Sequence, residues 1–152
     1  MIVRIAEEKD LSFLVSLEKE CFSMPWKEED LAFSLNQNWQ RVLICEENAV
    51  PIGYGLFFAV AGEWQIARLA TFLSARRRGV GEMIVRHAFS LCESEGGGEF
   101  FLEVRESNLA AIALYSKLGF SDCGKRENYY DKPKENALLM HRVVPGKTGE
   151  GS

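Results

Sequence analysis

Three consecutive arginines at positions 76–78 stand directly before Gly-Val-Gly at 79–81 and an apolar run typical of a helix. The start of a helix presents unpaired backbone N–H groups and the positive end of the helix dipole. Glycines let an anion approach the main chain closely, and arginines add charge-assisted contacts. The segment therefore predicts an anion site, although its spacing is neither that of a P-loop nor that of a dinucleotide fingerprint. A solvated basic turn capped by glycines is the alternative.

Glu103 is the candidate general base, because it interrupts the otherwise apolar strand sequence Phe-Phe-Leu-Glu-Val at 100–104. Strand alternation puts it on the same face as Phe101. Desolvation on that face would raise the pKa of the carboxyl group toward the working pH, as a general base requires. The alternative is an ion pair with a neighbour such as Arg105 or a lysine.

Tyr115 is the candidate general acid, and it shares a predicted helix face with Asn108 and Ile112 at spacing i, i+4, i+7. Asn108 and Tyr115 are separated by about 10 Å along the helix axis, so they could contact different parts of one extended ligand. A tyrosine on a core-facing stripe can also simply pack, with its hydroxyl hydrogen-bonded locally.

The elements that must position these residues alternate in a mixed order: paired strands come first, and strand–helix–strand units follow. This order predicts an α/β (α+β) fold with a mixed sheet of six to seven strands and about four helices. Strands are predicted at 1–6, 41–47, 52–60, 63–73, 99–106, 121–130 and 136–144, and helices at 11–21, 25–37, 79–95 and 108–120. We expect one domain over residues 1–143 and a disordered tail over 144–152.

Composition limits the function classes. The chain has 152 residues, 47% of them hydrophobic and 26% charged, and its net charge is −4, which argues against a nucleic-acid-binding protein. Four scattered cysteines and two histidines form no zinc pattern, so we expect no metal site and reduced thiols. Neither a signal peptide nor a membrane-length apolar run is present, and we expect a cytoplasmic monomer without a membrane partner.

The arginine-glycine segment resembles the acyl-CoA signature of the GNAT N-acetyltransferases, Gln/Arg-x-x-Gly-x-Gly/Ala, with Arg76, Gly79 and Gly81 at its positions. The segments ECFSMPW (20–26), LEVRESNLAAIALYSKLGF (102–120) and RENYY (126–130) are similar to the bacterial ribosomal-protein-alanine N-acetyltransferases, the RimI-type branch. The resemblance covers nearly all of residues 1–143. The loop 131–136 is shorter than is typical of that branch, which leaves peptide selectivity open because the loop borders the substrate groove.

The resemblance implies the GNAT fold, with a splayed strand pair that binds acetyl-CoA as co-substrate and its pyrophosphate at the glycine turn. It also implies Glu103 as general base, acting directly or through a water, and Tyr115 as the acid that protonates the leaving thiolate. Trp26, Tyr129 and Tyr130 would line the acceptor side, or else merely pack. The residues assigned to acetyl-CoA are Leu69, Ala70, Thr71, Arg76, Arg77, Arg78, Gly79, Val80, Gly81, Glu82, Asn108 and Tyr115.

The acceptor implied by the resemblance is the N-terminal α-amine, with alanine first, of a ribosomal protein. An α-amine has a pKa of about 8 against about 10.4 for lysine, so a modest base suffices to deprotonate it. Three alternatives remain open: a GNAT enzyme that acts on another N-terminus, one that acts on a lysine or a small amine, and an acyl-CoA-binding module without turnover.

Overall fold

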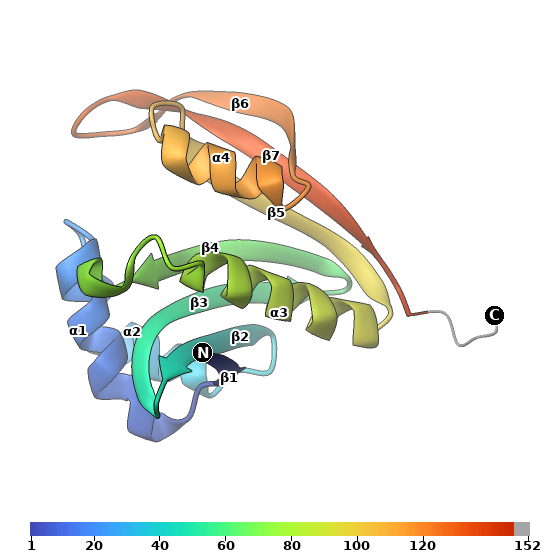
Figure 1. The fold of residues 1–152 in the computed structure, drawn as a ribbon. Helices are drawn as coiled ribbons and strands as arrows, with labels where there is room; N and C mark the ends of the chain where they lie inside the picture. The colour runs from blue at the N-terminus through green and yellow to red at the C-terminus, as the bar shows by residue number, and fades with distance from the viewer. Residues whose placement is uncertain (148–152) are drawn as a thin grey trace.

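The computed structural model describes residues 1–147, which build one seven-stranded sheet between two layers of helices (Figure 1). The strands are β1 (Ile2–Ile5), β2 (Gln40–Glu47), β3 (Val50–Val60), β4 (Glu63–Thr71), β5 (Gly97–Arg105), β6 (Ser121–Tyr130) and β7 (Glu135–Pro145). The helices are α1 (Leu11–Cys21), α2 (Glu28–Leu35), α3 (Val80–Ser94) and α4 (Leu109–Lys117), with short 3-10 turns at Glu8–Asp10 and Leu73–Ala75. The predicted mixed α/β fold is confirmed.

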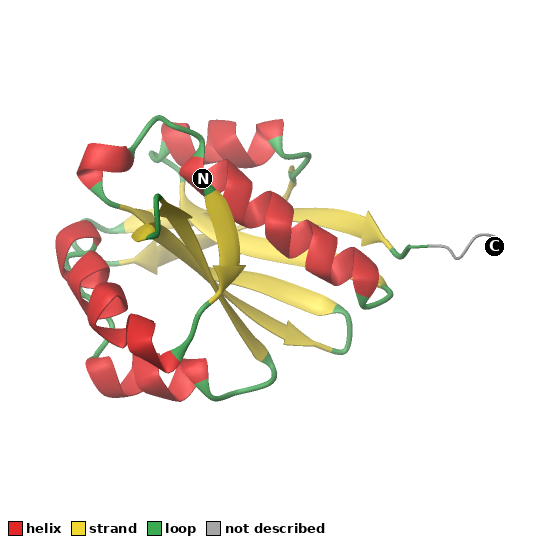
Figure 2. Cartoon of the chain, turned by 60° about the horizontal axis from the view of Figure 1, so that its bottom comes forward, coloured by secondary structure: helices red, strands yellow, loops and turns green. Residues whose placement is uncertain are grey.

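The strand order is β1-β2-β3-β4-β5-β7-β6, and only the β4–β5 pair is parallel among the described strands. Helices α3 and α4 cover one face of the sheet, and α1 and α2 cover the other (Figure 2). Strand alternation divides the core accordingly. Leu43 and Phe57 pack on the α3 side, whereas Ile44 and Leu56 pack on the α1–α2 side.

Strands β4 and β5 pair over only three positions, the last of which joins Gln65 to Phe101. Beyond that point β4 remains paired with β3, and β5 remains paired with β7. The two strands therefore separate in the middle of the sheet, and the predicted splayed pair is confirmed. The separation leaves the facing main-chain groups of residues 66–71 and 102–105 free of the usual sheet ladder.

Several predicted boundaries need correction. The expected domain end at residue 143 lies inside β7, because Val144 pairs with Gly98 and is buried. The N–H of Lys147 also donates to the carbonyl of Glu93, while the remainder of the predicted tail, 148–152, lies outside the described residues. The second helix is shorter than the predicted 25–37, since Lys27 is its N-cap in an extended conformation. In residues 1–147, no helix is long and apolar enough to cross a membrane.

Candidate active site

The entrance to α3 has the geometry expected of an anion site. Gly79 is the N-cap with φ +78°, a left-handed conformation that favours glycine, and no side chain caps the helix. A Cβ atom at Gly79 would meet nothing within 4 Å, so the turn is open on that side. Val80 anchors the turn in the core, and a Cβ at Gly81 would lie 3.4 Å from Leu69 of β4. The first amides of α3 are therefore uncapped and lie close to the separated strand.

The three arginines beside this turn differ in what they contact. Arg76 Nε donates to the carbonyl of Thr71 at 3.2 Å, which ties the turn to the end of β4. Arg78 forms an ion pair with Glu47, and this hydrogen bond lowers the pKa of the Glu47 carboxyl. Arg77 has φ +64° and makes no hydrogen bond or ion pair with a described residue. Among the three, Arg77 is the cation most available to an approaching anion.

The end of β4 offers main-chain groups to the gap between β4 and β5. The N–H of Phe72 donates to Ile52 of β3 at 3.1 Å. Alternation therefore directs the main-chain groups of Leu69 and Thr71 away from β3 and into the gap. Ala70 lies between them with its main chain turned toward β3 and its methyl group buried in the core. The prediction that Ala70 contacts acetyl-CoA thus lacks a free group to support it. Leu69 directs both its N–H and its carbonyl into the gap, whereas the Thr71 carbonyl already accepts from Arg76 and Cys21, which leaves the Thr71 N–H.

Glu103 lies on β5, on the sheet face opposite α3 and α4, and its side chain is 21% exposed. Its Oε2 is 3.0 Å from Arg126 Nε in an ion pair, yet this atom makes no hydrogen bond to a described residue. The hydroxyl of Tyr129 donates to Oε1 at 3.5 Å, a long contact. Both neighbours come from β6, so the expected ion pair exists, but with Arg126 rather than with Arg105 or a lysine. Oε2 is buried against Arg126, so Oε1, which accepts only the long contact from Tyr129, is the oxygen through which the carboxylate could accept a proton.

Arg105 instead holds the hairpin between β6 and β7. It pairs with Glu135 at 3.3 Å and donates to the carbonyls of Asp131 at 3.1 Å and Pro133 at 2.9 Å. Its guanidinium also lies 4.4 Å from the ring centre of Tyr130. Burial, followed by the nearby Glu103 carboxylate, raises the pKa of Tyr130. The two predicted wall residues, Tyr129 and Tyr130, are thus supported from β5 and lie beside Glu103.

Tyr115 lies on α4, 8% exposed, with its ring 5.5 Å edge-on from that of Phe120. Burial raises the pKa of its hydroxyl to about 12, and the hydroxyl makes no hydrogen bond to a described residue. The alternative in which Tyr115 only packs requires a local hydrogen bond to its hydroxyl, and no described residue makes one. Asn108 precedes the helix as its N-cap, where its side chain accepts from the N–H of Ala111 at 3.2 Å. This capping role was not predicted.

Trp26 follows α1 in the 22–27 loop, and its backbone N–H donates to Glu18 Oε1 at 2.7 Å. Arg68 of β4 lies 5.1 Å from the Trp26 ring centre and donates to the same carboxylate at 2.8 Å. Sequence reasoning missed Glu18 and Arg68. A signal for Glu18 was present, because it shares the apolar stripe of α1 with Leu14 and Cys21. No comparable signal marked Arg68 or Arg126.

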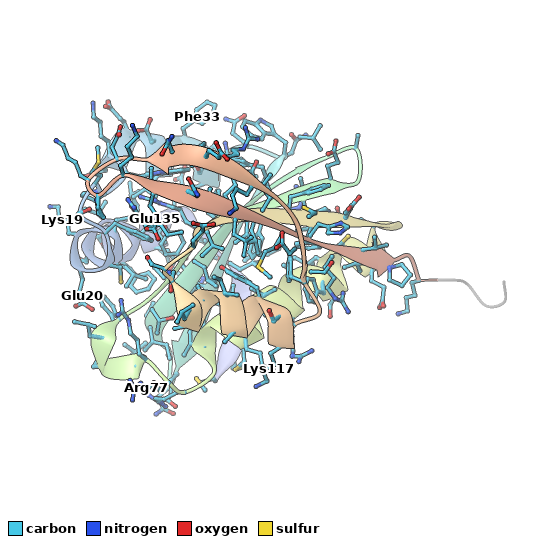
Figure 3. The ribbon with its side chains drawn as sticks, turned by 90° about the horizontal axis from the view of Figure 1, so that it is seen from above. Lys19, Glu20, Phe33, Arg77, Lys117 and Glu135 are labelled. Carbon is cyan, nitrogen blue, oxygen red and sulfur yellow. The ribbon has the colours of Figure 1, made fainter. Side chains whose placement is uncertain are left out.

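The entrance of α3 and helix α2 lie on opposite faces of the sheet. Figure 3 shows Arg77, at the α3 entrance, and Phe33, on α2, at opposite sides of the view down onto the β6–β7 hairpin.

Glu82, whose amide belongs to the α3 entrance, uses its side chain to bind Lys117 of α4 at 2.8 Å and Arg86 at 2.9 Å. These contacts lower the pKa of the Glu82 carboxyl, and the contact with Lys117 has the largest effect. The contact with Lys117 joins α4, which carries Tyr115, to α3.

Comparison with known proteins places the chain among acetyltransferases. The model of the acetyltransferase (GNAT) family matches residues 11–120. A Bacillus subtilis protein provisionally named ribosomal protein bS18-alanine N-acetyltransferase is 32% identical over 91% of this chain and 92% of its own length. The Escherichia coli protein of that name is 29% identical over 88% of this chain and 91% of its own. The crystal structure of the E. coli ribosomal-protein-S18-alanine N-acetyltransferase superposes with a TM-score of 0.88, covering 99% of this chain and 97% of the other at 27% identity.

Proposed function

Because the chain belongs to the acetyltransferase (GNAT) family, we propose that it transfers an acetyl group from acetyl-CoA to the N-terminal α-amine, with alanine first, of a ribosomal protein. The observation that carries the proposal is the uncapped entrance of α3 beside the separated strands β4 and β5. The acceptor class comes from the names of the relatives, two of which match nearly the full length of this chain.

The residues at the α3 entrance suit the pyrophosphate of acetyl-CoA. The amides of Val80, Gly81 and Glu82 point out of the helix start, the open side of Gly79 admits phosphate oxygens, and Arg77 adds a positive charge. The main-chain groups directed into the gap would hydrogen-bond the pantetheine arm, which is the type of contact that a missing sheet partner leaves available. Acetyl-CoA supplies the activated thioester.

Transfer then requires two proton movements. Glu103 accepts a proton from the α-amine, directly or through a water, and the amine nitrogen forms a bond to the acetyl carbonyl carbon. The carbon–sulfur bond breaks, and Tyr115 donates its hydroxyl proton to the departing thiolate. The products are an N-acetylated chain and a free thiol, and proton exchange through solvent then returns Glu103 to the carboxylate and Tyr115 to the phenol. Tyr115 carries its proton throughout the neutral range, and burial, which raises its pKa to about 12, makes it a weaker acid until the developing thiolate attracts the proton.

A thiol-release assay with purified protein tests this proposal. We expect release with peptides that begin with alanine, and no release when that amine is blocked, even if the peptide contains lysine. Glu103→Gln should lower kcat about a hundredfold or more, because general-base catalysis contributes about 10²–10⁴-fold. Full activity of Glu103→Gln from about pH 6 to about pH 9 would refute the assignment of the base.

Two further outcomes favour other functions. Release with free polyamines or aminoglycosides, but not with peptides, would indicate a small-amine enzyme. If acetyl-CoA raises the melting temperature but no amine releases thiol, the protein is a binding module, and the proposed activity is wrong.

A further inference from the structure

A buried cluster of Glu18, Tyr54 and Arg68 lies beneath the 22–27 loop. Glu18 has no exposed surface, and the exposed fraction of the Arg68 side chain is 17%. Arg68 donates to both carboxylate oxygens, at 3.2 and 2.8 Å, and the Tyr54 hydroxyl donates to Oε2. Burial and this carboxylate raise the pKa of Tyr54, so the phenol remains a donor. The carboxylate is therefore fully hydrogen-bonded.

The same cluster holds the loop by its backbone and by its aromatic rings. Glu18 accepts from the N–H of Trp26, and Arg68 Nη2 donates to the carbonyl of Met24 at 3.3 Å. The Arg68 guanidinium also lies 4.0 Å from the ring centre of Phe22 and 5.1 Å from that of Trp26. Four contacts thus fix the loop from below, at three of its residues.

Stability alone does not account for such a cluster. Replacing a buried ion pair by well-packed apolar side chains is often neutral or stabilising. What the pair provides here is geometry: the rigid fork of Arg68 joins β4, whose main chain faces the gap, to the loop that borders the acceptor side. Lysine could neutralise Glu18 but could not make the same set of contacts.

We propose that Glu18, Tyr54 and Arg68 are positioning residues that hold the 22–27 loop as a preformed wall for the acceptor peptide. This inference rests on the proposed function. Arg68→Lys should raise the KM for an alanine-starting peptide about tenfold, because a displaced loop weakens acceptor binding, and should leave the KM for acetyl-CoA unchanged. Hydrogen exchange at the Trp26 amide should quicken.

Arg4→Lys is the matched control. Arg4 also joins two carboxylates, Asp10 at 2.8 Å and Glu46 at 2.9 Å, and its exposed fraction, 25%, is similar to that of Arg68. It lies on β1, three strands from β4 in the sheet order. Arg4→Lys should lower the melting temperature and leave both KM values unchanged.

Equal losses of stability in the two variants, with the peptide KM within twofold of wild type in both, would overturn the inference. If Arg68→Lys fails to fold, Tyr54→Phe takes its place, because it removes one hydroxyl and should raise the peptide KM several-fold. An unchanged peptide KM there would also refute the proposal. If the wild type acetylates no α-amine, the proposed function fails, and exchange at Trp26 still tests the loop: unchanged exchange in Arg68→Lys refutes the clamp.

Discussion

Tyr115→Phe separates catalysis from packing at α4. The variant removes one oxygen from a side chain that is 8% exposed and whose hydroxyl makes no hydrogen bond to a described residue. Because no described partner is left unsatisfied, the melting temperature should stay within about 2 °C of wild type or rise. Loss of the proton donor should lower kcat by about 10²–10⁴-fold with little effect on the peptide KM.

The pH dependence of stability provides an independent check on Tyr115. Burial raises its folded pKa to about 12 from a usual value near 10. The stabilisation is therefore complete below about pH 10 and is lost as the pH rises toward about 12, because only the unfolded chain ionises there. A pKa difference of about two units between the folded and unfolded chain corresponds to about 3 kcal/mol of stabilisation of the folded state. About 1 kcal/mol of this is lost between about pH 10 and about pH 11.

Urea unfolding of both proteins at about pH 9 and about pH 11 measures this difference, and subtraction removes the titration of every other group. Wild type should lose about 1 kcal/mol more than Tyr115→Phe over that interval. Stopped-flow thiol release measures kcat for both. Full kcat in the variant refutes the acid role, and a low kcat accompanied by a drop of many degrees in melting temperature shows that the residue acts by packing.

Two other substitutions probe the cofactor side. Gly79→Ala should raise the KM for acetyl-CoA about tenfold and leave the peptide KM unchanged, because a left-handed alanine is strained by about 1–2 kcal/mol while its methyl group meets open space; a change confined to the amine constant would contradict the pyrophosphate assignment. Asn108→Ala should lose the helix cap, about 1 kcal/mol or about 2–4 °C, and raise the KM for acetyl-CoA. Asn108→Ser should recover the stability alone, and recovery of both would show that Asn108 only caps.

The fold and the α3 entrance were predictable because patterns of residues close together in the sequence determine them. Alternating apolar residues set the strands, and a glycine followed by an apolar stripe marks the start of a helix. The left-handed Gly79 follows from the same local pattern. Predictions failed where long-range pairing decides. The predicted strand 136–144 included Val144, but the predicted domain end at 143 excluded it, because its pairing with Gly98 spans 46 positions of sequence and no residue nearby indicates it.

The partners of the acidic side chains were less predictable than their positions. Alternation placed Glu103 correctly on the Phe101 face, but its ion pair is with Arg126 on β6, a strand that does not neighbour β5. Arg105, the nearer candidate in sequence, turns instead to the β6–β7 hairpin. A side chain as long as arginine can reach several acceptors, so sequence spacing cannot choose among them until the tertiary fold is known.

Arginines on the two separated strands have similar roles on opposite sides of the gap. Arg68 of β4 reaches the 22–27 loop through the carbonyl of Met24, and Arg105 of β5 reaches the hairpin through the carbonyls of Asp131 and Pro133. Each loop is therefore fixed to the strand whose main chain would also contact the pantetheine arm or carry Glu103. Strand β4 would then locate both one wall of the acceptor site and the pantetheine arm, so a shift of β4 would move the amine and the thioester together. Such a common frame is what direct transfer between two substrates needs, because misplacement by about 1 Å can lower the rate about 100-fold.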